Sequence, residues 1–451
     1  MPEDTATIEA RALFIQTFGC QMNVRDSEQM AELLRTQGYE LVDDEREADL
    51  IILNTCSIRA KAEQKAASYL GRIGEMKRRK RSIVIGMAGC LAQQWGRRAL
   101  DRLPYLDFVC GTHNIDMIPE MVQDARRHKT RRAETAFRET VASIGVAALP
   151  AKGSVTAFVT IMQGCDNYCT YCIVPYVRGR EESRESGEIL QEIRIMADKG
   201  VREVTLLGQN VNSYGMKLNR RLDFPGLLDR VSEIEGIERI RFISSHPKDL
   251  SDRLIDAFRV LPKLCDHIHL PVQAGSDRIL KLMGRGYGTS EYIEKVAKLR
   301  EARPGIAITT DFIVGFPGEA DEDFQKTIDL MEKIRFDNSF SFKYSPRPGI
   351  AAEFMEQGVP EEVKRERLTA VQALQRLHSC HSNRLMVGRQ VEVLVEGPSK
   401  RGEEDVMGRT GTNKIVNIAA PSIDAGSTVE VTIARAYLHS LRGEVRKKEK
   451  S

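Results

Sequence analysis

The first quarter of the chain alternates short apolar runs with amphipathic stretches. The apolar runs are ALFIQTF, DLIILNT, SIVIGMA and LDFV, and segments such as SEQMAELLRTQG separate them. Short apolar runs bounded by helical patterns are typical of strand and crossover-helix units. We therefore expect residues 9–126 to form an α/β domain with a doubly wound parallel sheet.

The alternation of strand and helix patterns resumes at residue 154 and continues to about residue 385. The candidate strands are TAFVTIM, VREVTLLG, RIRFISS, HIHLPV, IAITTDFIVGF and FSFKYS. Six such units fit a partial (β/α)6 barrel better than a full barrel of eight. We expect this barrel over residues 151–383, and the Ala, Gly and Pro in residues 127–150 indicate a linker before it.

The pattern changes again near residue 384. RQVEVLVEG and STVEVTIARAYLHSLRGEV alternate apolar and polar residues, with Gly-bearing turns between them. This period of two predicts a small antiparallel β-barrel over residues 384–447. A chain of 451 residues is long enough for these three domains.

One cysteine motif stands at the start of the expected barrel. In GCDNYCTYC, Cys165, Cys169 and Cys172 form a C-x3-C-x2-C array whose thiolates can converge on one inorganic centre. Three thiolates leave a four-iron cluster with one open iron, which can bind and activate a ligand. The alternative is a structural zinc knuckle, but the next Cys or His after the motif is His246, far along the chain.

Three further cysteines each end an apolar run of the first domain. These are Cys20, Cys56 and Cys90, and in a parallel sheet all three would meet at the carboxyl edge of the strands. The alternative is that they are buried cysteines acting as small hydrophobic residues. We assign that packing role to Cys110, Cys265 and Cys380.

The residues around the cysteines resemble a known family. AFVTIMQG and IVPYVRGRE flank the C-x3-C-x2-C array, Tyr171 precedes its last cysteine, and TFGCQMN, NTCSIR and MAGCLAQ come before it. Together these motifs resemble the methylthiotransferases of the radical S-adenosylmethionine (SAM) superfamily, and the C-terminal segment resembles the RNA-binding TRAM domain.

The resemblance implies two 4Fe-4S clusters, one on Cys165, Cys169 and Cys172 that also binds SAM, and an auxiliary one on Cys20, Cys56 and Cys90. It implies SAM contacts on the loops of the barrel, and it assigns no protein acid or base. The candidate SAM residues are Tyr171, Gln209, Ser244, Gln273, Phe316 and Glu319.

TFGCQMN, LLGQNVNSYG and FKYSPRPG are most similar to the branch of the family that methylthiolates carbon 2 of N6-dimethylallyladenosine beside the anticodon of tRNA. One SAM would methylate a sulfur on the auxiliary cluster, and a second would generate the radical. The implied partners are the tRNA anticodon stem-loop and a reductant such as flavodoxin or ferredoxin, and we expect a monomer. Alternatives are methylthiolation of threonylcarbamoyl-adenosine or of a ribosomal-protein aspartate, and a non-catalytic iron–sulfur RNA-binding protein.

The composition restricts where RNA could bind and which cell compartment is expected, but it does not indicate a function. The 67 basic and 64 acidic residues nearly balance, so only local runs such as KRRKR (77–81) and RRHKTRR (126–132) could contact RNA phosphates. No run of about 18 apolar residues exists, and the polar start MPEDTATIEA does not resemble a signal peptide. We therefore expect a cytoplasmic protein without a membrane segment, and nine cysteines in so long a chain do not indicate a disulfide framework.

Overall fold

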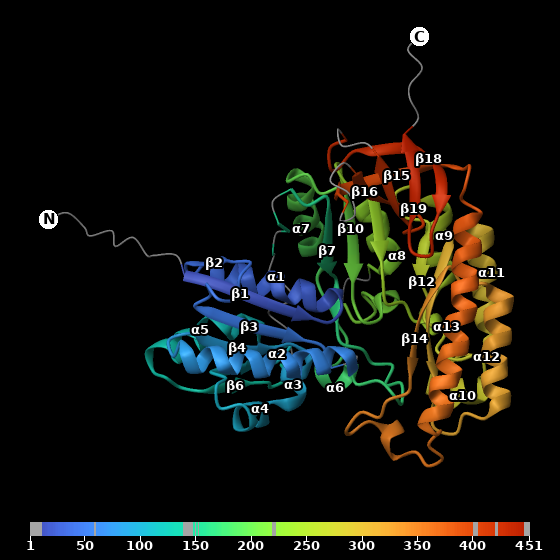
Figure 1. The fold of residues 1–451 in the computed structure, drawn as a ribbon. Helices are drawn as coiled ribbons and strands as arrows, with labels where there is room; N and C mark the ends of the chain where they lie inside the picture. Colours follow the sequence, from blue (N-terminus) through green and yellow to red (C-terminus); the bar gives the residue numbers. More distant parts are fainter. Residues whose placement is uncertain are drawn as a thin grey trace, which may run out of the picture. The chain divides into compact units, whose positions relative to one another are not determined.

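The computed structural model divides the chain into two compact units (Figure 1). It describes residues 11–57, 60–138, 148, 150–151, 153–218, 222–399, 405–419 and 423–445. The first unit comprises residues 1–150, 162–166 and 172–184, and the second comprises residues 151–161, 167–171 and 185–451. The C-x3-C-x2-C segment therefore passes from the first unit to the second and back again.

A parallel sheet of six strands forms the centre of the first unit. Its strands, in the order β2-β1-β3-β4-β5-β6, confirm the doubly wound fold predicted from the apolar runs. The sequence predicts a linker over residues 127–150, but β6 lies within this range. It forms a strand because it pairs with β5 and extends the sheet. The strands are β1 (Arg11–Phe18), β2 (Tyr39–Leu41), β3 (Leu50–Thr55), β4 (Val84–Ala88), β5 (Phe108–Cys110) and β6 (Arg132–Glu134).

Helices cover both faces of this sheet (Figure 1). On one face, Leu34 and Met121 pack against strand residues that include Ile52; on the other, Tyr69 and Ile73 pack against residues that include Ile51 and Ile85. Because neighbouring residues of β3 point to opposite faces and both faces are covered, all six residues of this strand are buried. The first face carries α1 (Gln21–Arg35) and α5 (Ile118–Arg127), and the second carries α2 (Ala60–Arg79), α3 (Cys90–Trp95) and α4 (Arg97–Arg102).

Short elements complete the first unit. They are η1 (Ile115–Met117), the antiparallel pair β8 (Met162–Gln163) and β9 (Glu182–Ser183), and α6 (Val174–Arg178). The last three come from the part of the chain around Cys165 and Cys172, so residues beside the C-x3-C-x2-C motif fold as part of the first unit.

The second unit contains the expected six parallel barrel strands. They form two three-stranded sheets, β11-β10-β7 and β12-β13-β14, and an isolated parallel bridge between Ile240 and Leu264 extends the first sheet beyond β11. This arrangement confirms the partial barrel. The strands are β7 (Thr156–Thr160), β10 (Glu203–Leu207), β11 (Arg239–Phe242), β12 (His267–His269), β13 (Ala307–Val314) and β14 (Asn338–Lys343).

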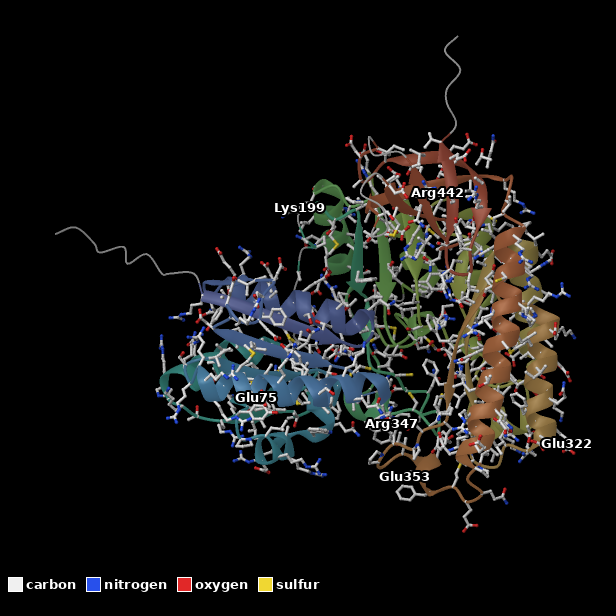
Figure 2. All side chains as sticks on the ribbon, in the orientation of Figure 1. Glu75, Lys199, Glu322, Arg347, Glu353 and Arg442 are labelled. Atoms are coloured by element: carbon white, nitrogen blue, oxygen red, sulfur yellow. The ribbon has the colours of Figure 1, made fainter. Side chains whose placement is uncertain are left out.

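Amphipathic helices alternate with these strands. In α12, Leu330 and Met331 are buried, whereas Glu322 in the first turn is exposed and points to solvent (Figure 2). The helices are α7 (Ser186–Asp198), α8 (Phe224–Ser232), α9 (Asp252–Val260), α10 (Asp277–Leu282), α11 (Thr289–Ala302), α12 (Asp321–Ile334) and α13 (Glu361–Arg384), with 3-10 turns η3 (Val211–Ser213), η4 (Pro247–Asp249) and η5 (Ala351–Phe354). The last helix, α13, packs on the barrel, where Gln375 donates to the Phe336 carbonyl at 2.8 Å.

The C-terminal strands close into a small barrel in the order β15-β16-β17-β19-β18. All neighbours are antiparallel except β17 and β19, which is a parallel pair. The strands are β15 (Gln390–Pro398), β16 (Asp405–Thr410), β17 (Ile415–Ala419), β18 (Thr428–Ala436) and β19 (Leu441–Val445), around a core that includes Val393, Val416 and Ile433. Arg239, the first residue of β11, donates to the carbonyl of Arg409 at 2.6 Å, and Arg241 in the same strand donates to the carbonyls of Thr410 and Gly411 at 2.7 and 3.0 Å. The small barrel is thereby anchored to the amino ends of the larger barrel's strands.

In the described ranges of the chain, no helix is both long enough and apolar enough to cross a membrane.

Candidate functional site

The three strand-end cysteines of the first unit lie at one edge of its sheet. Cys20 follows β1, Cys56 follows β3, and Cys90 begins α3 directly after β4. These strands are neighbours, and their ends are level because Phe18 pairs with Thr55 and Asn54 pairs with Ala88. The topology therefore brings together cysteines that are more than thirty residues apart in sequence.

Two asparagines fasten this edge. The Asn54 amide donates to the Asn23 carbonyl at 2.8 Å and to the Ser27 hydroxyl at 2.9 Å, while the Asn23 amide donates to Asn54 Oδ1 at 3.1 Å. Gly89, directly before Cys90, has a φ of +87°, and a Cβ there would lie 2.3 Å from Asn54 Oδ1. The Asn residues of TFGCQMN and NTCSIR and the Gly of MAGCLAQ thus hold the three strand ends at a fixed spacing.

The electrostatics of this edge favour a thiolate. A hydrogen bond from Cys56 lowers the pKa of Cys20 to about 6, and the Arg178 guanidinium acts in the same direction against the opposing effect of burial. Arg178 is 3% exposed and forms a bidentate pair with Asp26, at 2.5 and 3.3 Å. Burial raises the pKa of the Cys90 thiol. Since the thiolate is the form that ligates metals, the lowered pKa of Cys20 fits a ligand of an iron–sulfur cluster.

Arg178 comes from the segment that follows the second cysteine motif. It ends α6, which begins two residues after Cys172. The Thr112 hydroxyl donates to the carbonyl of Val177 at 2.6 Å, and the His113 ring contacts the Arg178 carbonyl at 2.9 Å, which fixes this short helix to the sheet. The segment after the motif therefore supplies the buried cation of the first cysteine set.

The cysteines of the C-x3-C-x2-C motif divide between the units. Cys165 and Cys172 belong to the first unit and Cys169 to the second. The Cys165 N–H donates to the Gly179 carbonyl at 3.3 Å. Gly164 has a φ of +78°, and a Cβ there would lie 1.9 Å from the Arg180 carbonyl, so this turn requires glycine.

Two donors face the Cys169 sulfur inside the second unit. Arg285 Nη1 lies 3.4 Å and His246 Nε2 lies 4.0 Å from Cys169 Sγ. Cys169 is 7% exposed, Arg285 is 4% exposed and His246 is 6% exposed. The side chains around this cysteine are thus fixed by burial.

The position of His246 bears on the alternative of a zinc site. His246 is far from the motif in the sequence, but its Nε2 lies 4.0 Å from Cys169 Sγ in the structure. However, His246 Nδ1 accepts the Lys248 backbone N–H at 3.2 Å, so in a neutral ring Nε2 carries the hydrogen. Burial, with the nearby Arg285 cation, lowers the pKa of His246 to about 2, which keeps the ring neutral. His246 Nε2 therefore faces Cys169 as a donor and has no lone pair for a zinc ion. Among the described residues, no three or more His, Cys, Asp or Glu side chains converge on the position of a single metal ion, as a zinc site requires.

The candidate SAM residues on the barrel follow the carboxyl ends of its strands. Gln209 follows β10, Ser244 follows β11, Gln273 follows β12, and Phe316 and Glu319 follow β13. Ser244 and Gln273 both have positive φ angles, +67° and +76°. Backbone strain of this kind in non-glycine residues is concentrated at ligand sites, and the sequence carries no sign of it.

Three candidates have defined partners. The Phe316 ring is fully buried and lies edge to face with Tyr171 at 6.5 Å and with Tyr344 at 5.3 Å between ring centroids. Glu319 accepts the Gly315 N–H at 3.0 Å and pairs with Arg367 at 2.7 Å. Phe316 and Glu319 thus hold the shape of the loop after β13 through contacts with other protein residues.

The sequence prediction did not include several residues that surround the cysteines. They are Asn23, Asp26, Asn54 and Arg178 in the first unit and His246, Arg285 and Tyr287 in the second. The two asparagines and Arg178 stand within motifs that support the family resemblance, so those motifs contained a signal for them. Arg285, in LKLMGRGYG, lies more than a hundred residues from Cys169 and carries no such signal.

Comparisons with known proteins agree with this geometry. The Radical SAM superfamily matches residues 159–331, the Uncharacterized protein family UPF0004 matches residues 12–111, and the TRAM domain matches residues 384–445. The radical SAM match indicates an iron–sulfur cluster and SAM as cofactors of the larger barrel.

Among solved structures, the radical SAM methyltransferase TsrM from Kitasatospora setae is similar with a TM-score of 0.56 and 13% identity, over 76% of this chain and 74% of that one. The cobalamin-dependent SAM radical enzyme OxsB has a TM-score of 0.52 and 13% identity, over 82% of this chain and 56% of that one. At these identities the likeness shows the fold.

Curated relatives are much more similar. A tRNA-2-methylthio-N(6)-dimethylallyladenosine synthase of Syntrophus aciditrophicus is 57% identical over 97% of this chain and 95% of the relative. One of Geobacter sulfurreducens is 53% identical over 97% of this chain and 98% of the relative. The chain therefore belongs to the family of tRNA-2-methylthio-N(6)-dimethylallyladenosine synthases.

Proposed function

We propose that this enzyme adds a methylthio group to carbon 2 of N6-dimethylallyladenosine next to the anticodon of tRNA. The named relatives are synthases of 2-methylthio-N6-dimethylallyladenosine in tRNA, and a TRAM domain is the RNA-binding module expected of such an enzyme. The observation that carries the proposal is the presence of two separate three-cysteine sets in a chain with a radical SAM barrel.

Cys165, Cys169 and Cys172 would hold the 4Fe-4S cluster that binds SAM, and Cys20, Cys56 and Cys90 would hold an auxiliary 4Fe-4S cluster. When bound, such clusters supply the electron that cleaves SAM reductively and the sulfur that is transferred. The open position on each follows from the number of cysteines, since three thiolates leave one iron of four without a protein ligand.

The protein's own groups supply position and charge. Asn23 and Asn54 hold the strand ends that carry the auxiliary set, and Arg178 places a cation beside it. At the other set, His246 and Arg285 direct N–H donors at Cys169. No carboxylate pair or Ser-His-Asp set is needed for this chemistry, because the cofactor carries the bond-breaking step.

The rim of the larger barrel would hold SAM, through Tyr171, Gln209, Ser244, Gln273, Phe316 and Glu319. Support for this assignment comes from their position after the strand ends, where barrel enzymes bind ligands. The partners would be the tRNA anticodon stem-loop and a one-electron reductant such as flavodoxin or ferredoxin, acting on a monomeric enzyme in the cytoplasm.

The decisive experiment is mass spectrometry of tRNA nucleosides from cells that lack the gene. We expect loss of the 2-methylthio group with N6-dimethylallyladenosine retained, and recovery when the gene is restored. A change in threonylcarbamoyl-adenosine instead would assign the chain to a different substrate. Unchanged tRNA with an altered ribosomal protein would exclude tRNA as the substrate.

Cofactor content gives an independent test. Protein reconstituted without oxygen should contain iron and sulfide for two four-iron clusters, and the Cys56→Ala variant should contain one. Iron equivalent to one cluster in the unaltered protein, or stoichiometric zinc, would contradict the two-cluster proposal.

A further inference from the structure

Arg285 is a buried cation without a carboxylate partner in the described part of the chain. Its Nε donates to the Tyr287 hydroxyl at 3.1 Å and its Nη2 to the Pro271 carbonyl at 2.7 Å. Its Nη1 faces Cys169 Sγ and the Tyr171 hydroxyl, both at 3.4 Å. None of these four partners is a carboxylate.

Three other arginines with a similar degree of burial are paired with carboxylates. Arg178 pairs with Asp26, Arg241 with Glu203 and Arg367 with Glu319, and each of these three arginines is 6% exposed or less. A buried charge without a counter-ion is strongly unfavourable, so proteins rarely keep one without a function. Arg285 therefore requires an anion that the polypeptide does not supply as a carboxylate.

The contacts of Arg285 indicate where that anion lies. Its four contacts fix the planar guanidinium, and the Nη1 edge is the one that faces the sulfur. His246 Nε2 is directed at the same sulfur atom, while its Nδ1 is held by the Lys248 N–H. Cys169 Sγ is thus the common acceptor of a charged donor and a neutral donor, both fixed by other hydrogen bonds.

We propose that Arg285 is a positioning residue that stabilises the reduced state of the iron–sulfur cluster at Cys169 and so raises its reduction potential. This inference rests on the proposed function, in which Cys169 is a cluster ligand. Reduction adds one electron from an external one-electron reductant, breaks no bond, and makes the cluster more negative by one charge. A fixed cation and N–H donors at a ligand sulfur favour that extra charge, because hydrogen bonds and net charge tune cluster potentials.

The test is a redox titration of the full-length reconstituted enzyme without SAM, followed by EPR. We expect two reduction waves, one for each cluster. Arg285→Gln should move one wave to more negative potential and leave the other unchanged, so the second cluster serves as an internal control for folding. Arg285→Lys keeps the charge and should move that wave less than Arg285→Gln does.

Tyr287→Phe is the matched control for packing. It removes the hydroxyl that accepts the Arg285 Nε hydrogen bond and keeps the charge, so we expect a smaller shift than from Arg285→Gln. Equal shifts in Tyr287→Phe and Arg285→Gln would overturn the role of the charge. A reduction potential that changes in Arg285→Gln only after SAM is added would also overturn the proposal, since Arg285 would then act by binding SAM.

The remaining outcomes are also decisive. If the unaltered enzyme contains two clusters and neither wave moves in Arg285→Gln, the inference fails and the proposed function stands. If the unaltered enzyme contains fewer than two clusters, the proposed function fails first. If the Arg285→Gln variant loses the cluster at Cys169, the Arg285→Lys variant gives the answer. Retention of both clusters in Arg285→Lys supports a role for the positive charge. Loss of this cluster in both variants shows instead that the shape of arginine is required.

Discussion

The two cysteine sets differ in how the chain assembles them and in the charge beside them. Cys20, Cys56 and Cys90 come from three strand ends, which hydrogen bonds between Asn23 and Asn54 hold together. Cys165, Cys169 and Cys172 come from one segment of eight residues. The first set therefore depends on the sheet, whereas the second depends on a local loop.

The charges show a second difference. Arg178, beside Cys20, is neutralised by Asp26, whereas Arg285, beside Cys169, has four contacts and no carboxylate among the described residues. A cluster that must be reduced by an external donor benefits from an unpaired cation, because the cation stabilises the added electron. The two cysteine sets thus contain the same number of thiols but differ in the charge that lies beside them.

The largest effect should follow loss of Cys169. Cys169→Ala removes a proposed ligand of the SAM-binding cluster, so we expect no cleavage of SAM to 5′-deoxyadenosine and no methylthio product. Chromatography of the nucleosides released under reducing conditions measures both. Continued SAM cleavage would show that this set is not the one that binds SAM.

Cys56→Ala should separate the two activities. The variant keeps the C-x3-C-x2-C motif, so SAM cleavage should continue while methylthiolated tRNA is lost. Mass spectrometry of the tRNA product and chromatography of 5′-deoxyadenosine give the comparison in one reaction. A Cys56→Ala enzyme that still forms methylthio product would remove the auxiliary set from the mechanism.

Asp26→Asn should leave the arginine beside the first cysteine set without a carboxylate partner, as Arg285 is beside Cys169. It leaves Arg178 buried without a carboxylate, and breaking a buried pair in this way costs about 3–5 kcal/mol of stability. Denaturant unfolding of the cluster-free protein measures the loss, and the matched control Arg46→Gln, in an exposed pair of the same unit, should show no measurable change. In the reconstituted enzyme, the auxiliary cluster should become easier to reduce. A stability equal to that of the unaltered protein would show that Asp26 does not compensate Arg178.

Gly89→Ala adds a single methyl group beside Cys90 and should disturb the spacing of Cys20, Cys56 and Cys90. Its Cβ would meet Asn54 Oδ1 at 2.3 Å and the Thr55 carbonyl at 2.8 Å, so the edge that holds the auxiliary set must shift. Gly305→Ala is the matched control, because Gly305 also has a positive φ, +83°, but no atom within 4 Å of the added carbon. We expect both variants to lose about 1 kcal/mol from backbone strain, and only Gly89→Ala to lose iron from the auxiliary cluster. Equal iron content in the two variants would contradict the fastening role of this edge.

Much of the fold could be read from local patterns. The continuous apolar runs predicted β1, β3, β4 and β5, and the structure adds the short edge strands β2 and β6. β6 has three half-buried residues and no apolar run, so its sequence, RAE, gave no strand signal and fell within the predicted linker. Edge strands are poorly visible in sequence because only one neighbour and part of one face constrain them.

The sequence by itself determined the fold class, an α/β chain with a small C-terminal β-barrel, and it gave the six cysteines that we propose as cluster ligands. This is because strand and helix periods repeat along the chain and thiolate chemistry needs a specific residue type. Only the tertiary structure decided which groups surround those cysteines. Arg178 beside Cys20, and Arg285 and His246 beside Cys169, are brought there by contacts between residues more than seventy positions apart. Charge and hydrogen bonding act through space at distances of a few ångströms, so they leave no periodic trace in the sequence.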